Sequence, residues 1–291
     1  VAGICQHGNL ASGVWHLQSL KTMNAYIVKA YRSAVGKANK GSFKNFRSDD
    51  LAVEVVKYLM EQTPEVDPQL VDDVIVGCAN PEGEQGLQIG RQIALRALGK
   101  SVPGMTVNRY CASGLETISI AVGKIAAGMG HVFIAGGAES MSLGPMTGYK
   151  LAPSYQVAAD NPNYLASMGL TAEAVAEKYG ISREQADKFA LRSHTLAGKA
   201  IAEGKFQDEI VPVEVKEVFV KNNKRQENSF TMDTDEGVRP DTNLKVLGKL
   251  RPVFRQGGVV TAGNASQTSD GAAFTVVVSE EMVKQLNLQP I

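Results

Sequence analysis

From residue 23 onward, short apolar segments typical of strands alternate with segments of helical periodicity, and this alternation constrains the fold more than any other feature. The strand-like segments lie at 24–31, 74–78, 106–108, 131–135 and 273–279. The helical patterns between them lie at 51–62, 88–98 and 115–129. Strands that alternate with helices are typical of a parallel or mixed sheet with helices on its faces. We therefore expect an α/β fold of this kind.

The pattern after residue 113 is the most regular of the helical ones. Its apolar residues step by three or four positions and so form one apolar face, made of Leu115, Ile118, Val122, Ile125 and Met129. Two other helices carry capping signals at their start. Ser48 is followed by two acidic residues, which suit the positive end of a helix, and Ser182 with Gln185 has the capping-box pattern. We expect Ser48 to act as the N-cap of its helix.

Between residues 143 and 249 the pattern changes. Two helical stretches, at 171–179 and 182–204, are followed by a short apolar segment and by the charged segment 221–228, which we expect to be a solvated loop. We interpret residues 143–249 as an inserted, mainly helical loop subdomain. Residues 23–142 and 250–291 would then form one α/β domain around it.

The first 22 residues differ from the rest of the chain. They contain one basic residue, no acidic residue and the only tryptophan, Trp15. A transit peptide is normally rich in arginine, and a secretory signal has a basic start and a longer apolar centre. Neither description fits, so we interpret residues 1–22 as an extension or a tag.

Composition excludes several partners. Thirty basic residues balance thirty acidic ones, so no overall charge attracts nucleic acid or an anionic membrane. No apolar run reaches the roughly 20 residues needed to cross a bilayer. The three cysteines are too scattered for a disulfide framework or a zinc site, which fits a reducing compartment. We expect a cytoplasmic protein without a metal and without nucleic-acid or membrane partners.

Cys111 is the strongest candidate for a reactive side chain. It lies between an expected strand and the start of the helix at 115–129, where backbone N–H groups and the helix dipole favour a thiolate. The same N–H groups can stabilise an oxyanion. Free cysteines are also often small buried hydrophobic residues, so position alone leaves both interpretations open. For Cys78, at the end of an apolar segment, a buried structural thiol is the better interpretation.

Other candidate residues carry weaker signals. None of the four histidines lies in a loop typical of a general base: His7, His16, His131 and His194. The glycine-rich segments 136–139 and 261–266 lack the spacing of a dinucleotide or phosphate-binding loop, so we interpret them as tight turns at strand ends. We expect no permanently bound cofactor.

Several segments together resemble one known family. Residues 108–114 read Asn-Arg-Tyr-Cys-Ala-Ser-Gly, and residues 135–142 read Ala-Gly-Gly-Ala-Glu-Ser-Met-Ser. Further motifs lie at 77–86, 167–173, 249–254 and 260–266. These segments resemble motifs of the thiolase family (3-ketoacyl-CoA thiolase, or acetyl-CoA C-acyltransferase). The resemblance runs from residue 23 to the last residue and corresponds to the N-terminal half of a thiolase with its loop domain.

The resemblance implies an acyltransferase of fatty acid β-oxidation and lipid metabolism, with coenzyme A as a substrate. Cys111 would attack a 3-ketoacyl-CoA at its keto carbon, release acetyl-CoA and pass the acyl group to free coenzyme A. By the same resemblance, the inserted subdomain at 143–249 would bind coenzyme A. Arg239 would lie against the adenine, Ser266 would contact pantetheine and Met168 would line the acyl end. Ser167 and the segment 267–271 look closer to degradative, broad-chain thiolases.

One departure from the family pattern matters. The second half of a complete thiolase supplies an Asn in an NEAFA motif, a His in a GHP motif and a Cys in a CxGxG motif, and this sequence has none of the three. We expect a truncated chain that is poorly active alone, and a helix face around Leu115 that is exposed or covered by a partner. The partner would be another copy in a homo-oligomer, or a chain that supplies the missing half.

Two alternatives to a thiolase reaction by this chain stay open. The first is a non-catalytic, thiolase-like subunit that binds coenzyme A thioesters or a partner protein. The second, a decarboxylating condensing enzyme, fits less well because segments 249–254 and 260–266 look specifically like thiolase.

Overall fold

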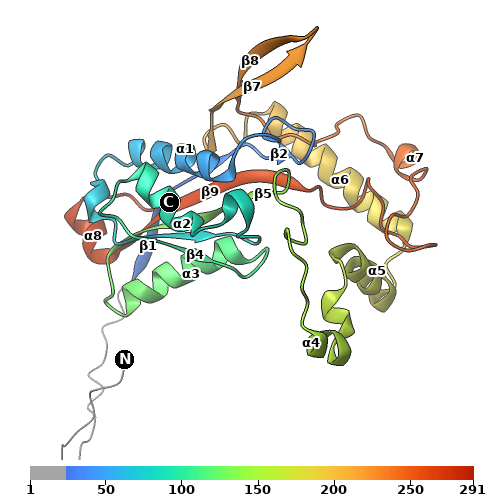
Figure 1. Ribbon diagram of the computed structural model, residues 1–291, viewed down its shortest axis with the longest axis horizontal. Helices are drawn as coiled ribbons and strands as arrows, with labels where there is room; N and C mark the ends of the chain where they lie inside the picture. The colour runs from blue at the N-terminus through green and yellow to red at the C-terminus, as the bar shows by residue number, and fades with distance from the viewer. Residues whose placement is uncertain (1–23) are drawn as a thin grey trace, which may run out of the picture.

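The computed structural model describes residues 24–291 and is built around one mixed sheet (Figure 1). The expected extension at 1–22 lies outside the described residues. The sheet has seven strands: β1 (Ala25–Ser33), β2 (Gly36–Lys37), β3 (Asp73–Gly77), β4 (Gly104–Val107), β5 (Val132–Ser140), β6 (Ile210–Val211) and β9 (Ser269–Ser279). Their order is β4-β3-β5-β9-β1-β6, and β2 pairs with β9. β3 runs parallel to β4 and β5, whereas β9 runs antiparallel to β5 and β1, so the expected mixed sheet is confirmed.

Helices cover both faces of the sheet, as expected. Successive strand residues point to opposite faces, and Val74 and Val76 lie in one core cluster while Ile75 lies in the other. The first cluster includes α1 (Ser48–Glu61) and α2 (Ile89–Ala97), and the second includes α3 (Ser113–Ala126). Both faces of the sheet are therefore buried in its central part, which explains the continuous apolar runs of β3 and β5.

α3 turns its small residues toward the sheet. Its buried residues are Ser113, Thr117, Ala121 and Ile125, spaced by four. The expected exposed face holds for Leu115, which is 73% exposed, and for Val122. It is wrong for Ile125, which packs with Ile75 and Phe133 in the core. The apolar pattern of this helix thus covers two sides, one against the sheet and one open.

The segment between β5 and β9 contains most of the remaining elements. They are α4 (Tyr155–Asp160), α5 (Met168–Tyr179), α6 (Arg183–Ala202), α7 (Leu244–Leu247), β7 (Val213–Lys221) and β8 (Lys224–Met232). The capping box of Ser182 and Gln185 is present at the start of α6. β6 also comes from this segment and pairs with β1 in the main sheet. The division at residues 143 and 249 stays a prediction.

The charged segment 221–228 was expected to be a solvated loop, and this is wrong. It forms the end of β7, a two-residue turn and the start of β8, in a hairpin that projects from the body (Figure 1). Asn222 and Asn223 have φ angles of 55° and 56°, in the left-handed region that a two-residue hairpin turn needs at both positions. Asparagine tolerates this region better than most residues, so the turn forms without glycine.

Short elements complete the chain. They are α8 (Glu280–Gln285) and three 3₁₀ helices, Pro68–Leu70, Gly83–Gln85 and Pro162–Leu165. The expected N-cap of α1 needs a correction: Ser48 is the first helical residue and the preceding Arg47 makes no capping hydrogen bond. Instead Arg47 pairs with Asp49 in the first turn. None of the helices between residues 24 and 291 is both long and apolar enough to cross a membrane.

Candidate functional site

Cys111 lies at the junction between β4 and α3, two residues before the first residue of the helix. Its side chain is exposed and is not part of a disulfide. The positive end of the helix dipole is therefore close to it in sequence. Tyr110, directly before it, has φ +47°, a left-handed conformation that is uncommon for a large side chain.

Two side chains hold this junction in place. Asn108 Oδ1 accepts a hydrogen bond from the N–H of Tyr110 at 2.9 Å, and its Nδ2 donates to the carbonyl of Ala79 at 3.0 Å. Ser113 Oγ accepts from the N–H of Arg109 at 2.8 Å and donates to the carbonyl of Tyr110 at 2.5 Å. The unusual conformation of Tyr110 is thus fixed from both sides, as expected for strained backbone at a functional site.

Glycines allow close backbone contacts between α3 and β3 and between β3 and β5. A Cβ on Gly77 would lie 2.6 Å from the carbonyl carbon of Ser113, and one on Gly137 would lie 2.8 Å from the carbonyl oxygen of Gly77. Gly136 and Gly137 were expected in a tight turn, but they lie within β5. The reason for glycine is therefore the close approach of neighbouring backbones and not a turn. At 261–266 the turn is confirmed, with Ala265 N–H bonded to the carbonyl of Thr261.

A carboxylate lies behind the loop that Asn108 contacts. Glu139, near the end of β5, accepts hydrogen bonds from the N–H of Ala79 at 2.6 Å and from Gln85 Nε2 at 2.7 Å. The Cys78 thiol is 3.9 Å from the same carboxylate. Burial, together with this nearby negative charge, raises the pKa of Cys78 to about 12. Cys78 is therefore buried as expected, and it remains a thiol at neutral pH.

The described histidines make their contacts away from Cys111. His131 Nδ1 lies 3.0 Å from Ser279 Oγ, where β5 begins. His194, on α6, accepts a hydrogen bond from the N–H of Arg239 at 3.2 Å. Among residues 24–291 no imidazole is hydrogen-bonded to Cys111, and no group of three or more His, Cys, Asp or Glu side chains could hold a metal ion. This part of the chain thus places a thiol at a helix start and both of its histidines in other contacts.

The residues expected to contact coenzyme A, namely Met168, Arg239 and Ser266, are all exposed. Met168 is the first residue of α5. Farther along α5, Glu173 accepts hydrogen bonds from the N–H groups of Val259 and Val260, each at 2.9 Å.

These contacts tie α5 to the segment that leads to Ser266. Next to Ser266, Gln267 donates to the carbonyl of Glu236 at 3.3 Å, three residues before Arg239. The three residues thus lie on connected segments, but no described hydrogen bond or ion pair links these segments directly to Cys111.

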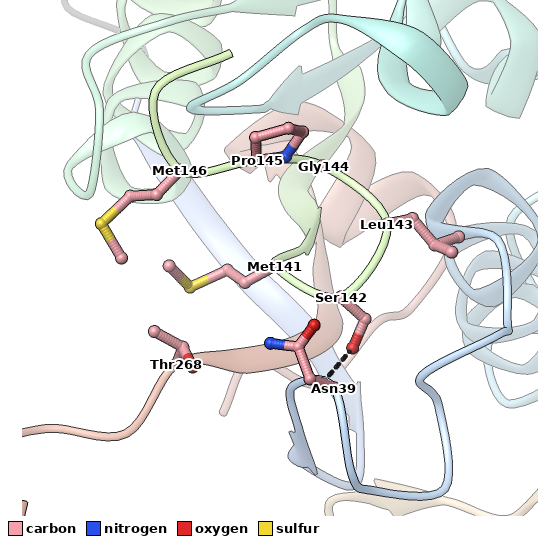
Figure 2. A pocket seen from close by; sticks show the side chains of 8 residues that line it. All are labelled: Asn39, Met141, Ser142, Leu143, Gly144, Pro145, Met146 and Thr268. Atoms are coloured by element: carbon pink, nitrogen blue, oxygen red, sulfur yellow. Dashed lines mark hydrogen bonds between the residues drawn. The ribbon is translucent and has the colours of Figure 1, made fainter. Parts of the chain in front are cut away.

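A cavity of about 330 Å³ lies beside the loop that follows β5 (Figure 2). Its lining comprises Asn39, Met141, Ser142, Leu143, Gly144, Pro145, Met146 and Thr268. Figure 2 shows the Met141 and Met146 side chains pointing in the same direction, and the N–H of Asn39 donating to Ser142 Oγ. The carbonyl of Pro145 accepts a hydrogen bond from Asn80 Nδ2 at 2.7 Å. One residue of the cavity lining, Pro145, is therefore hydrogen-bonded to the 78–80 loop that supports Asn108.

Sequence reasoning missed the residues that support Cys111. Glu139 and Asn108 both fall inside recognisable motifs, but neither motif shows which backbone groups their side chains hold. The one available signal was a carboxylate directly after two glycines and an alanine in an apolar strand, where a charge must find hydrogen-bond donors.

Comparisons with known proteins agree with the fold. A family model described as "Thiolase, N-terminal domain" matches residues 25–281. A 3-ketoacyl-CoA thiolase of Bacillus subtilis (strain 168) is 50% identical over 269 residues, which cover 92% of this chain and 68% of the relative. A 3-ketoacyl-CoA thiolase of Marinobacter nauticus is 41% identical over 281 residues, with 94% and 68% covered.

A solved structure matches as well. The crystal structure of the Bacillus anthracis acetyl-CoA acetyltransferase has a TM-score of 0.79 and 38% identity, and the match covers 93% of this chain and 69% of that one. The resemblance read from the motifs and the expected fold class are both confirmed.

Proposed function

Since this chain belongs to the thiolase family, we propose that it cleaves 3-ketoacyl-CoA with coenzyme A, giving acetyl-CoA and a shortened acyl-CoA through an acyl group on Cys111. The observation that carries the proposal is the exposed Cys111 thiol at the start of α3, in a loop fixed by Asn108 and Ser113. Thiolates are favoured at such positions. The buried Cys78, with its raised pKa, offers no comparable nucleophile.

The proposed reaction has two transfers. The Cys111 sulfur attacks the keto carbon, and the bond between that carbon and the α-carbon breaks. The α-carbon takes a proton and leaves as acetyl-CoA, while the acyl group stays on sulfur as a thioester. The thiol of free coenzyme A then attacks this thioester, restoring Cys111. In the proposal Met168 lines the acyl end, Ser266 contacts pantetheine and Arg239 lies against the adenine.

Each transfer moves a proton, so each needs an acid or a base. Because neither described histidine is hydrogen-bonded to Cys111, we propose that this chain alone acylates more readily than it turns over. A partner chain of different sequence would supply the missing groups. We extend the proposal to a cytoplasmic role in fatty acid β-oxidation.

A second candidate is a non-catalytic subunit that binds coenzyme A thioesters or a partner. The contacts of the two described histidines, neither of which is hydrogen-bonded to Cys111, favour it, since a binding protein needs no base beside Cys111. The two candidates differ in one respect: only the first uses the thiol of Cys111 to form a covalent bond.

Intact-protein mass spectrometry after mixing the chain with acetoacetyl-CoA separates the candidates. We expect one acetyl group on Cys111, no adduct on Cys111→Ala, and an unchanged adduct on Cys78→Ala. Addition of coenzyme A then tests the second transfer. Coenzyme A thioester binding without any adduct would favour the binding subunit and contradict the acyl-enzyme. Rapid turnover by the chain alone would contradict the proposed dependence on another chain.

A further inference from the structure

The junction before α3 depends on a support that lies outside its own sequence. Tyr110 keeps its φ of +47° while its N–H is bonded to Asn108. Asn108 in turn can hold this position only if its own amide is fixed, and the carbonyl of Ala79 is the group that fixes it. The orientation of Cys111 therefore depends on the position of the 78–80 loop.

That loop is held from β5. The N–H of Ala79 donates to Glu139 Oε2 at 2.6 Å, a short hydrogen bond to a charged acceptor and thus one of the stronger kinds. Gln85, which is 2% exposed, links Glu139 Oε1 to the carbonyl of Asn80 and accepts from the N–H of Ser140. Both oxygens of Glu139 are thus occupied by donors, and the loop is anchored on a rigid central strand.

We infer that Glu139 is a positioning residue for Cys111. Its carboxylate fixes the peptide of Ala79, the carbonyl of Ala79 fixes the amide of Asn108, and Asn108 holds Tyr110 so that Cys111 stays at the start of α3. This inference rests on the proposed function, in which Cys111 is the nucleophile. It adds a residue on another strand that controls how the nucleophile is presented.

The chemistry of the site explains why this residue is a carboxylate. A carboxylate accepts on both oxygens, whereas the amide of a glutamine accepts on one atom only. In Glu139→Gln, one of the donors of Ala79 and Gln85 therefore faces an NH₂ group and loses its bond. An aspartate in its place is one carbon shorter and cannot reach both donors.

An effect of Glu139 through its charge and an effect through positioning would change the reactivity of Cys111 in opposite directions, and this makes the inference testable. A nearby negative charge disfavours a thiolate. At Cys78, burial is the larger cause of the raised pKa, and the charge of Glu139 raises it further. If Glu139 acted on Cys111 through its charge, its removal would make Cys111 react faster. If it acts by positioning, its removal makes Cys111 react more slowly.

The experiment measures two rates on the whole chain: alkylation of Cys111 by iodoacetamide and acetylation of Cys111 by acetyl-CoA, each followed by mass spectrometry. Both are measured at several pH values between about 7 and 9, where the ordinary thiol begins to ionise. We expect Glu139→Gln and Asn108→Ala each to slow acetylation about tenfold, which is less than the loss that a misplacement of 1 Å can cause. We expect alkylation of Cys111 to be slower in both variants than in the unchanged chain.

Asp72→Ala is the matched control, because both of its hydrogen bonds end on one oxygen, Oδ2, and an asparagine could keep them. Asp72 also accepts hydrogen bonds from two backbone N–H groups, those of His131 and Val132, but at the opposite end of β5. Its loss should lower the unfolding temperature without changing either rate at Cys111. The exposed side chain of Asn108 provides a second variant that tests the same relay if Glu139→Gln folds poorly.

The double variant distinguishes a relay from two separate effects. If Glu139 acts through Asn108, combining Glu139→Gln with Asn108→Ala slows acetylation no more than the stronger single variant does. A product of the two single losses, unchanged rates, or faster reaction in Glu139→Gln would overturn the inference. If the unchanged chain takes no acetyl group at all, the proposed function fails, and the alkylation rates still decide whether Glu139 positions Cys111.

Discussion

Replacing Gly77 by alanine tests how tightly α3 is seated on the sheet. The added Cβ would lie 2.6 Å from the carbonyl carbon of Ser113 and 2.7 Å from the N of Gly114, both backbone atoms that no rotamer change can move. An ordinary contact begins at 3.4 Å, so the start of α3 must shift by about 0.8 Å. Overpacking of this kind typically costs about 1–3 kcal/mol.

The same shift moves Cys111, which lies just before the helix. A displacement near 1 Å at a reacting group can cost up to about a hundredfold in rate. We therefore expect Gly77→Ala to lower the unfolding temperature by roughly 2–4 °C for each kcal/mol lost. We also expect it to slow acetylation of Cys111 by acetyl-CoA at least several-fold.

Gly123→Ala provides the control on the same helix. A Cβ there meets no atom within 4 Å, and the residue is exposed in the interior of α3. Alanine in a helix interior is more stable than glycine by about 0.5–1 kcal/mol. Urea and thermal unfolding should thus give opposite signs for the two variants. Equal stability of Gly77→Ala and the unchanged chain, with unchanged acetylation, would refute the seating of α3 described above.

Three further predictions concern other parts of the chain. In the folded chain at pH 9, iodoacetamide should modify Cys111 and spare Cys78, whose pKa is raised to about 12 by burial and by Glu139. In the unfolded chain Cys78 loses its proton near the ordinary pKa of 9.0, so the free energy of unfolding should fall as pH rises from about 9 toward 12. Peptide mapping checks which cysteine is modified, and urea unfolding at two pH values checks the fall in stability. Glu173→Gln should lower the free energy of unfolding by about 1–3 kcal/mol, because the buried carboxylate accepts hydrogen bonds from two backbone N–H groups. Glu177 forms an exposed ion pair with Arg255, so Glu177→Gln should change the unfolding temperature little. Asn223→Gly should slow tryptic cleavage in the β7–β8 turn, because glycine adopts positive φ freely, and Asn223→Val should speed this cleavage. Equal cleavage rates for the two variants would contradict the turn geometry.

The alternation of strands and helices was readable because it depends on local pattern. Buried strands such as β3 are continuous apolar runs, and α6 begins with a capping box that is complete within four residues. Such features need no knowledge of distant contacts, so sequence periodicity alone places them correctly.

Features that depend on distant partners were not readable. The hairpin of β7 and β8 has a charged, exposed sequence, so no apolar alternation announces it and only its two asparagines mark the turn. Gly136 looked like a turn residue because its neighbours in space, on β9, lie more than a hundred positions later in the chain. Glu139 lies in a motif that the sequence analysis identified, but its contact with Ala79 follows from the pairing of β3 with β5.

The position of β9 has a consequence for how the protein comes into being on the ribosome. This strand lies between β5 and β1, pairing with one along Val132–Ser140 and with the other along Ala25–Arg32. Until residues 269–279 leave the ribosome, the β4-β3-β5 group and the β1-β6 pair have no common strand to join them. From the synthesis of β5 until that of β9, the nascent chain therefore has two unpaired sheet edges, and such edges favour association with other chains. Completion of this sheet therefore depends on a single strand near residue 270.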